Sequence, residues 1–314
     1  MEKKAKQPVA VVLGSGAARG LAHIGVLKAL EEHHLKPDLI VGSSMGAMIG
    51  GAYAAGLNPD QIAEIACRTN WKKVVQILFP KRFRRDGLLD GDRVEEFLIS
   101  LLGEENIEDL PKRFACVATD LLTGEEIVLN SGSLINAIRA SISFPFLFQP
   151  VKIGQNYLID GGVVNPVPVS VAREMGAHTV IACNVTPSVE HRARQLNSGR
   201  MVTREKLLAA GSSSSFLQRL FGDVLERLRH EQQEARLQRA PKLGLQKQMA
   251  QVAMTMENMI LNLRLQQSAP DLLINPPVSS YQFFDFKKAE EIIEAGRKAA
   301  EMALEKWEAN QSEI

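Results

Sequence analysis

Residues 38–56 place a serine between a short apolar run and a helix of small residues, and this junction constrains the fold more than any other part of the chain. The sequence reads DLIVGSSMGAMIGGAYAAG. Gly42, Ser44 and Gly46 fit the pattern G-x-S-x-G, in which a serine on a sharp strand-to-helix turn projects its hydroxyl above a sheet. Bulky residues beside it would collide with the incoming strand or the outgoing helix. Ser44 is therefore a candidate nucleophile.

Strand-like and helix-like segments alternate on either side of this junction. VAVVLG, residues 9–14, is a continuous apolar run typical of a strand that is buried on both faces of a sheet. LAHIGVLKALEEHH follows with a helical spacing of apolar residues, and FACVAT and HTVIACNV are later buried runs. The alternation predicts an α/β fold with a mostly parallel, doubly wound sheet.

A change of composition after about residue 187 divides the chain into three parts. Residues 8–185 carry the alternating elements and the candidate chemistry. Residues 186–248 form an insertion rich in Arg, Gln and Ser, and 249–310 read as helix, strand and helix that complete the first domain.

Two amphipathic helices are expected in or beside the insertion. Residues 216–229, FLQRLFGDVLERLR, gather apolar side chains on one face. Packing on the protein body, a lid, and peripheral contact with an anionic membrane all suit this stretch. Residues 245–265 are expected to form a core-covering or dimer-forming helix. Its apolar residues recur at spacings of three and four: Leu245, Met249, Val252, Met256, Ile260 and Leu263.

A glycine-rich loop, GSGAARG at residues 14–20, lies between the first expected strand and its helix. Such a loop exposes several backbone N–H groups at the start of a helix, where they can bind an oxyanion or a phosphate. Arg19 is interpreted first as a residue that holds the loop in shape. Contact with a substrate phosphate is the alternative.

A general base for Ser44 has to be sought among the histidines and the acids. None of the six histidines lies in a late loop with a motif around it, and His23 is expected to be a packing residue inside an apolar helix face. Asp160 ends an apolar strand in YLIDGG, where Gly161 and Gly162 permit a tight turn at the carboxyl edge of the sheet. An ordinary Asp-Gly turn is the competing interpretation.

Composition removes several other classes of function. The net charge is +1 and aromatic residues make up 5% of the chain, so a nucleic-acid partner is not expected. Three scattered cysteines indicate reduced thiols rather than a zinc site. With no stretch near the length of a membrane-spanning helix, we expect a cytoplasmic protein. A dinucleotide fold is disfavoured, because the glycine spacing is G-x-G-x-x-x-G and Asp38 precedes its strand.

Five segments of the chain, among them the glycine loop and the serine turn, occur in the order that one family shows. They are LGSGAARGLAHIGVLKAL, GSSMG, VATDLLTGE, AIRASISFPFLFQPV, and DGGVVNPVP followed by MGAHTVI. On these segments the chain resembles the patatin-like phospholipases, in their bacterial lysophospholipase and neuropathy-target-esterase branch. DLLINPPV and FFDFKKAEEIIEAG resemble the same branch. Ser15 stands where a third glycine is common, and Ser43 where threonine is frequent.

The resemblance implies a three-layer α/β/α fold with an additional helical C-terminal region. It implies a serine esterase that acts on phospholipids or lysophospholipids without metal or cofactor, and peripheral contact with the inner membrane surface is an open alternative to a free cytoplasmic protein. Ser44 would be the nucleophile, Asp160 the base, and the amides of Gly14, Ser15 and Gly16 the oxyanion hole.

This mechanism makes two demands on the structure. Asp160 should be partly desolvated, with a raised pKa, and within hydrogen-bond reach of Ser44, because an ordinary aspartate is a poor base at neutral pH. An apolar pocket should receive the acyl chain, with Phe144, Phe146 and Phe148 or the stretch near Phe216 as its lining. An acyltransferase with the same dyad and a lipid-binding regulatory protein are the alternatives, and self-association through 245–265 stays open.

Overall fold

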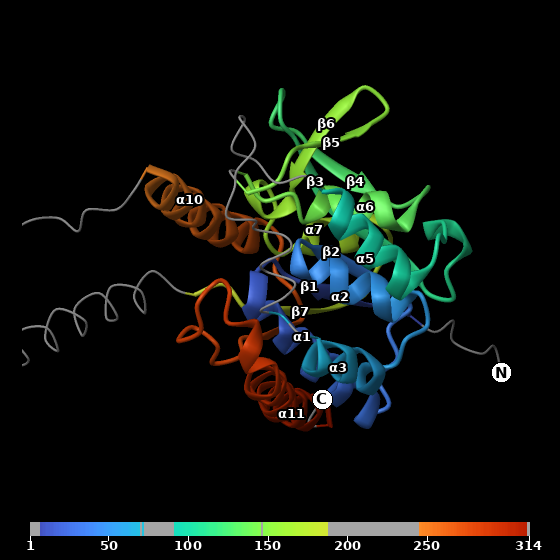
Figure 1. Cartoon of the computed structure of the whole chain (residues 1–314). Coiled ribbons are helices and arrows are strands. Elements are labelled where there is room, and N and C mark those ends of the chain that lie inside the picture. Colours follow the sequence, from blue (N-terminus) through green and yellow to red (C-terminus); the bar gives the residue numbers. More distant parts are fainter. Residues whose placement is uncertain (1–6, 70, 72–90, 146, 188–244, 313–314) are drawn as a thin grey trace, which may run out of the picture. The chain divides into compact units, whose positions relative to one another are not determined.

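The computed structural model describes residues 7–69, 71, 91–145, 147–187 and 245–312 (Figure 1). The chain divides into one compact unit made of residues 1–187 and 249–314 and a second unit, Ser188–Gln248. Almost all of the second unit lies outside the described residues, as does the amphipathic stretch expected at 216–229. The fold below is that of the first unit.

An eight-stranded mixed sheet forms the middle of this unit. Its strands are β1 Val9–Leu13, β2 Leu39–Ser43, β3 Arg113–Asp120, β4 Glu126–Leu129, β5 Val151–Ile153, β6 Asn156–Asp160, β7 Thr179–Cys183 and β8 Leu272–Ile274. The order is β5-β6-β3-β2-β1-β7-β8, and β4 pairs with β3. The five strands from β3 to β8 in that order are parallel, whereas β4, β5 and β6 are antiparallel to their neighbours.

The helices lie in the connections between the strands and, for α11, after the last strand. They are α1 Ala22–Glu32, α2 Met45–Ala54, α3 Pro59–Arg68, α5 Asp92–Leu102, α6 Leu134–Ser141, α7 Val169–Glu174, α10 Leu245–Gln267 and α11 Ala289–Ser312. Short 3-10 turns are η1 Ala17–Leu21, η2 Ile107–Asp109, η3 Gly161–Val163 and η4 Phe286–Lys288.

Alternating residues of the central strands bury the two faces of the sheet. Val11 and Leu13 of β1 pack in a core shared with α1, α2, α3, α5, α6 and α11. Ala10 and Val12 face the other way, into a core shared with α7 and Leu261 of α10. Helices therefore cover both faces, which confirms the three-layer α/β arrangement with a mostly parallel sheet.

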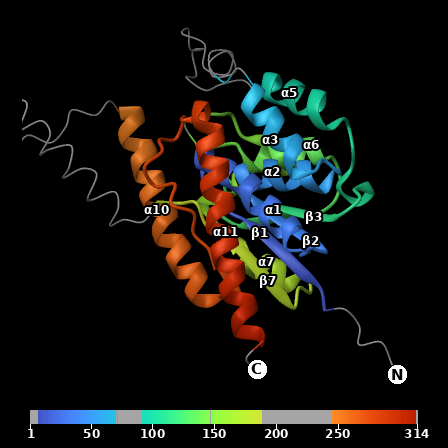
Figure 2. The same ribbon diagram turned by 90° about the horizontal axis from the view of Figure 1, so that it is seen from below.

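Helices α1 and α11 meet at backbone distance (Figures 1 and 2). A Cβ atom on Gly25 of α1 would lie 1.9 Å from the carbonyl oxygen of Ile293, and one on Gly296 of α11 would lie 2.0 Å from that of Ala22. Each helix thus presents a glycine to the backbone of the other, and a side chain at either position would force the two apart.

The orientation of α10 differs from the expectation of a core-covering apolar stripe. Val252, Met256 and Leu263 are more than half exposed, while Glu257 and Leu261 are buried. The core-covering alternative for the stripe is therefore wrong. The face that packs on the sheet is instead the one that brings Leu261 into the core and Glu257 toward the carboxyl ends of the strands.

Candidate active site

Ser44 lies on the turn between β2 and α2 in a strained backbone conformation, with φ 54° and ψ −120°. A Cβ atom at Gly46 would lie 1.9 Å from the carbonyl oxygen of Leu13, and one at Gly42 would lie 2.5 Å from the amide nitrogen of Ala47. Both glycines are therefore required sterically, as the motif predicts.

The backbone amide of Ser44 is held by a second serine. It donates to Ser141 Oγ at 2.9 Å, and Ser141 Oγ donates in turn to the carbonyl oxygen of Val117 at 2.7 Å. Ser141 is fully buried at the end of α6. These two hydrogen bonds fix the strained turn to β3. They also occupy the Ser44 N–H, which is then not available to a substrate.

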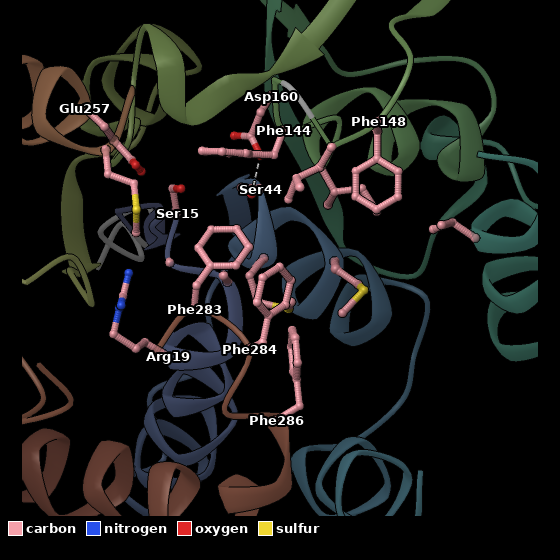
Figure 3. A pocket seen from close by; sticks show the side chains of 18 of the residues that line it. Ser15, Arg19, Ser44, Phe144, Phe148, Asp160, Glu257, Phe283, Phe284 and Phe286 are labelled. Atoms are coloured by element: carbon pink, nitrogen blue, oxygen red, sulfur yellow. Dashed lines mark hydrogen bonds between the residues drawn. The ribbon is translucent and has the colours of Figure 1, made fainter. Parts of the chain in front are cut away.

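Ser44 and Asp160 are in direct contact. Ser44 Oγ donates to Asp160 Oδ2 at 2.6 Å, and the amide of Gly162 donates to Asp160 Oδ1 at 2.7 Å (Figure 3). The predicted proximity of the serine and the aspartate is therefore confirmed in the structure.

The position of Asp160 follows from strand register. Strand β6 runs antiparallel to β3 and places Asp160 opposite Ala118, one residue beyond the Val117 that pairs with Ser43. A Cβ atom at Gly161 would lie 2.1 Å from the carbonyl oxygen of Val117, so the turn after β6 requires a glycine. The carboxyl edge of the sheet is the expected location, but the side chain is only 2% exposed and not on an open turn.

The environment of Asp160 raises its pKa to about 7. Burial is the largest cause, and the carboxylate of Glu257 adds to it, whereas the hydrogen bonds from Ser44 and Gly162 act in the opposite direction. A carboxylate with this pKa is a much stronger base at neutral pH than an ordinary aspartate.

Histidine takes no part in the contact with Ser44. His23 Nε2 donates to the carbonyl oxygen of Gly14 at 2.7 Å, and burial lowers its pKa to about 4. His23 is therefore neutral, as expected of a packing residue, and it orients the first peptide of the glycine loop. The described residues that line the pocket beside Ser44 include no histidine.

The glycine loop offers different donors from those expected. The amide of Gly14 donates to Cys183 O at 3.0 Å and that of Ser15 to Pro166 O at 2.8 Å. The expectation that these two amides bind an oxyanion is wrong, because they extend the backbone bonding of the sheet. Among the described residues, the amides of Gly16 and Ala17 have no acceptor, and both residues line the pocket. Ala17 has φ 49°, a conformation that favours glycine.

Arg19 lies at the same end of the pocket and is 5% exposed. Its Nη1 donates to the carbonyl oxygen of Tyr281 at 3.2 Å, so Arg19 ties η1 to the segment before α11. This contact agrees with the interpretation of Arg19 as a residue that holds the loop in shape.

An apolar pocket adjoins the Ser44–Asp160 pair. Figure 3 shows Ser15, Arg19 and Glu257 on one side of the pair and aromatic rings on the other. Phe144 and Phe148 line it, as predicted, whereas Phe146 and Phe216 lie outside the described residues. The remaining large apolar lining residues are Met45, Met48, Trp71, Val94, Phe97, Ile142, Leu147, Met254, Phe283, Phe284 and Phe286.

Sequence reasoning did not single out four contributors to this site: Ala17, Ser141, Glu257 and the aromatic cluster before α11. The ring of Phe283 lies 5.3 Å from that of Phe144 in a tilted arrangement and 4.7 Å from that of Phe284 in an edge-to-face one. The segment FFDFKK that supplies this cluster was named only for its family resemblance, without a role in the site. In the part of the chain that the structure describes, no cluster of three His, Cys, Asp or Glu residues could hold a metal ion.

Comparison with known proteins identifies the family. Residues 11–173 match the family model of the patatin-like phospholipases. An uncharacterised NTE family protein of Mycobacterium tuberculosis is 31% identical, over 97% of this chain and 93% of its own. Lysophospholipase NTE1 of Debaryomyces hansenii is 29% identical over 96% of this chain, which spans only 18% of that protein.

The chain therefore belongs to the patatin-like phospholipase family. Membership supports a lipid hydrolase activity. VipD from Legionella pneumophila is a solved structure with a TM-score of 0.46 and 13% identity, matched over 96% of this chain and 67% of VipD. Along the described ranges, no helix has the length and apolarity to cross a membrane.

Proposed function

We propose that the protein is a serine esterase that hydrolyses acyl ester bonds of phospholipids or lysophospholipids through a Ser44–Asp160 dyad. The observation that carries this proposal is the 2.6 Å hydrogen bond from Ser44 Oγ to a buried aspartate at the edge of an apolar pocket. The family and the name of the Debaryomyces relative, a lysophospholipase, support the choice of substrate.

In the first half of the proposed reaction, Asp160 accepts the proton of Ser44 as Oγ attacks the ester carbonyl carbon. The carbonyl oxygen becomes an oxyanion, and the amides of Gly16 and Ala17 are the donors that lie open to it. When the tetrahedral intermediate collapses, the ester C–O bond breaks, the alcohol leaves with the proton from Asp160, and the acyl group stays on Ser44.

In the second half, water replaces the alcohol. Asp160 accepts a proton from the water, whose oxygen attacks the acyl carbon. Collapse of the second intermediate returns that proton to Ser44 Oγ and releases the fatty acid. The aromatic side of the pocket suits the acyl chain, because an apolar lining favours a hydrocarbon over water.

The test compares the wild type with Ser44→Ala and Asp160→Asn on a mixed lipid extract, with identification of the products. Free fatty acid should appear with the wild type and be lost in both variants. Ser43→Ala is the matched control, because Ser43 is the adjacent buried serine and its Oγ has no partner among the described residues. Fatty acid released at the wild-type rate by Ser44→Ala would refute the proposal.

The same experiment separates the two alternatives. Addition of a competing alcohol or lysolipid acceptor should leave fatty acid as the main product of an esterase. Transfer to the acceptor as the main product would instead show an acyltransferase that uses the same dyad. Lipid binding without either product would show a regulatory protein.

Two contacts with partners are also proposed. Residues 216–229, which lie outside the described residues, would touch an anionic membrane surface at the cytoplasmic side. Self-association would use the exposed stripe of α10, formed by Met249, Val252, Met256, Met259 and Leu263. In 249–267 the two charged side chains, Glu257 and Arg264, are buried and half-buried, so two copies of this face would meet without charge repulsion. Sedimentation of wild type and Met256→Lys tests this contact.

A further inference from the structure

Glu257 brings a second carboxyl group to the dyad from a distant part of the chain. It lies on α10, is 9% exposed, and lines the same pocket as Ser44 and Asp160. In Figure 3 its side chain lies on the polar side of the pocket, next to Ser15. The steps proposed above for hydrolysis assign it no role.

Gly162 provides a common reference point for the two carboxyl groups. A Cβ atom built on Gly162 would lie 2.9 Å from Glu257 Oε1, 3.0 Å from Asp160 Oδ1 and 2.7 Å from Ser15 Oγ. The two carboxyl oxygens are therefore within about 6 Å of each other, the range in which one charge changes the ionisation of another. Glycine at 162 leaves this space free of a side chain.

Helix α10 is fastened to the body of the protein two turns away from Glu257. Arg264 Nε donates to Val164 O at 3.2 Å, and its Nη2 forms an ion pair with Glu126 Oε2 at 2.9 Å. Leu261, between the two, is buried in the core. Glu257 is thus held at a fixed place relative to the turn that follows Asp160, and not at the end of a free side chain.

Other charged or titratable groups face Asp160 from the elements packed around it. Asp120 of β3 accepts hydrogen bonds from the turn amides of Leu122 and Thr123. Arg19 of η1 donates to a backbone carbonyl, and His23 of α1 is neutral. From the turn before α2, the side chain that faces Asp160 is the uncharged Ser44. Glu257 is the like charge that acts on Asp160 in the described site, and it raises the Asp160 pKa.

We propose that Glu257 is a positioning residue for hydrolysis: its carboxylate, held across Gly162, keeps Asp160 a strong enough base to take the proton of Ser44. This inference rests on the proposed function. The charge destabilises the carboxylate form of Asp160, so Asp160 has a higher proton affinity and takes the proton of Ser44 more readily. Helix α10 therefore contributes to the chemistry although it touches neither reacting atom.

The test is the pH dependence of kcat/KM on a short soluble ester, from pH 5 to pH 9, for wild type, Glu257→Gln and Glu257→Asp. Activity should rise with pH as Asp160 loses its proton. In Glu257→Gln this rise should move to lower pH by about one unit, and the plateau should fall several-fold, because Asp160 becomes a weaker base. Glu257→Asp keeps the charge and should restore most of the wild-type profile.

Glu126→Gln is the matched control. It breaks the ion pair that fastens α10 but leaves the charge of Glu257 in place, so the profile should stay where it is in the wild type. A shift of equal size in this control would show that the docking of α10 matters and would overturn the proposal. An unchanged profile in Glu257→Gln would overturn it too. So would complete loss of activity at every pH in folded Glu257→Gln, since that would indicate direct participation in the chemistry.

Labelling with a fluorophosphonate, which reacts with activated serines, separates this inference from the proposed function. The rate of Ser44 labelling should follow the same shifted profile in Glu257→Gln. If wild type neither hydrolyses the ester nor labels at Ser44, the dyad itself fails, and the inference fails with it. If wild type does both and Glu257→Gln shows no shift, only the role of Glu257 fails.

Discussion

Asp160→Asn should stabilise the folded protein at alkaline pH while it abolishes hydrolysis. The pKa of Asp160 is about 7 in the folded state, against 3.8 for an ordinary aspartate. A carboxyl group whose pKa is raised by folding contributes no penalty below its unfolded pKa and loses stability as pH rises through its folded pKa. An asparagine carries no charge at any pH, so the substitution removes this loss.

The structure gives the size of the effect. A difference of roughly three pKa units costs about 4 kcal/mol of unfolding free energy above pH 7, and less than about 2 kcal/mol at pH 5. The amide oxygen of asparagine can still accept the hydrogen bond that Gly162 donates, but its NH2 group cannot accept the one that Ser44 Oγ donates to Oδ2, which costs about 1 kcal/mol at both pH values. At pH 8 the variant should therefore be more stable than wild type by about 3 kcal/mol.

The measurement is urea unfolding of both proteins at pH 5 and pH 8. The stability difference between variant and wild type should grow by about 3 kcal/mol from pH 5 to pH 8, and the hydrogen-bond cost cancels in this comparison. Asp120→Asn is the control: the hydrogen bond from the Thr123 amide lowers the pKa of Asp120, so Asp120 is ionised throughout this range and the stability difference for this variant should be the same at pH 5 and pH 8. A difference for Asp160→Asn that is the same at both pH values would refute the reasoning.

Three further predictions concern the turn, a helix contact and the insertion. Ser44→Gly should be more stable than Ser44→Ala by about 1 kcal/mol, because glycine tolerates φ 54°; equal unfolding midpoints would contradict this. Gly25→Ala should lose at least about 2 kcal/mol by thermal unfolding, since its Cβ would meet a backbone oxygen at 1.9 Å. Gly50→Ala is its control and should lose less, because the nearest atom there is a side-chain methyl of Ile40 at 2.9 Å. Deletion of residues 212–230 should reduce hydrolysis of vesicle lipids more than of short soluble esters, and equal losses would count against membrane contact.

The local parts of the site could be predicted from the sequence because short-range sterics determine them. The elbow around Ser44 needs glycine at 42 and 46, and the acid before Gly161 needs a tight turn. Each requirement is visible within a few residues. The expectation that Asp160 sits at the carboxyl edge of the sheet is also confirmed, although its strand runs antiparallel to β3 and not parallel to it.

The contributions that the sequence could not reveal depend on contacts between distant segments. Ser141 is one serine among several in its segment until α6 brings it against the Ser44 amide. Glu257 lies on a helix whose apolar stripe predicts that the other face is buried, so the sequence places Glu257 on the exposed side. The open donors of the glycine loop also begin two residues later than expected, because the amides of Gly14 and Ser15 are bonded to Cys183 and Pro166.

The contact between α1 and α11 can form only late in the synthesis of the protein. Strand β1, the serine elbow and Asp160 leave the ribosome early, but the helix that covers α1 begins only at Ala289. At typical elongation rates the stretch between residue 187 and Ala289 takes roughly 5 to 20 s to translate. During that time α11, which packs against Gly25, has not been made, and the edge of β7 that pairs with β8 is unpaired. The nascent chain therefore exposes an apolar flank after both residues of the dyad have been synthesised, and exposed apolar surface of this kind is what chaperones bind.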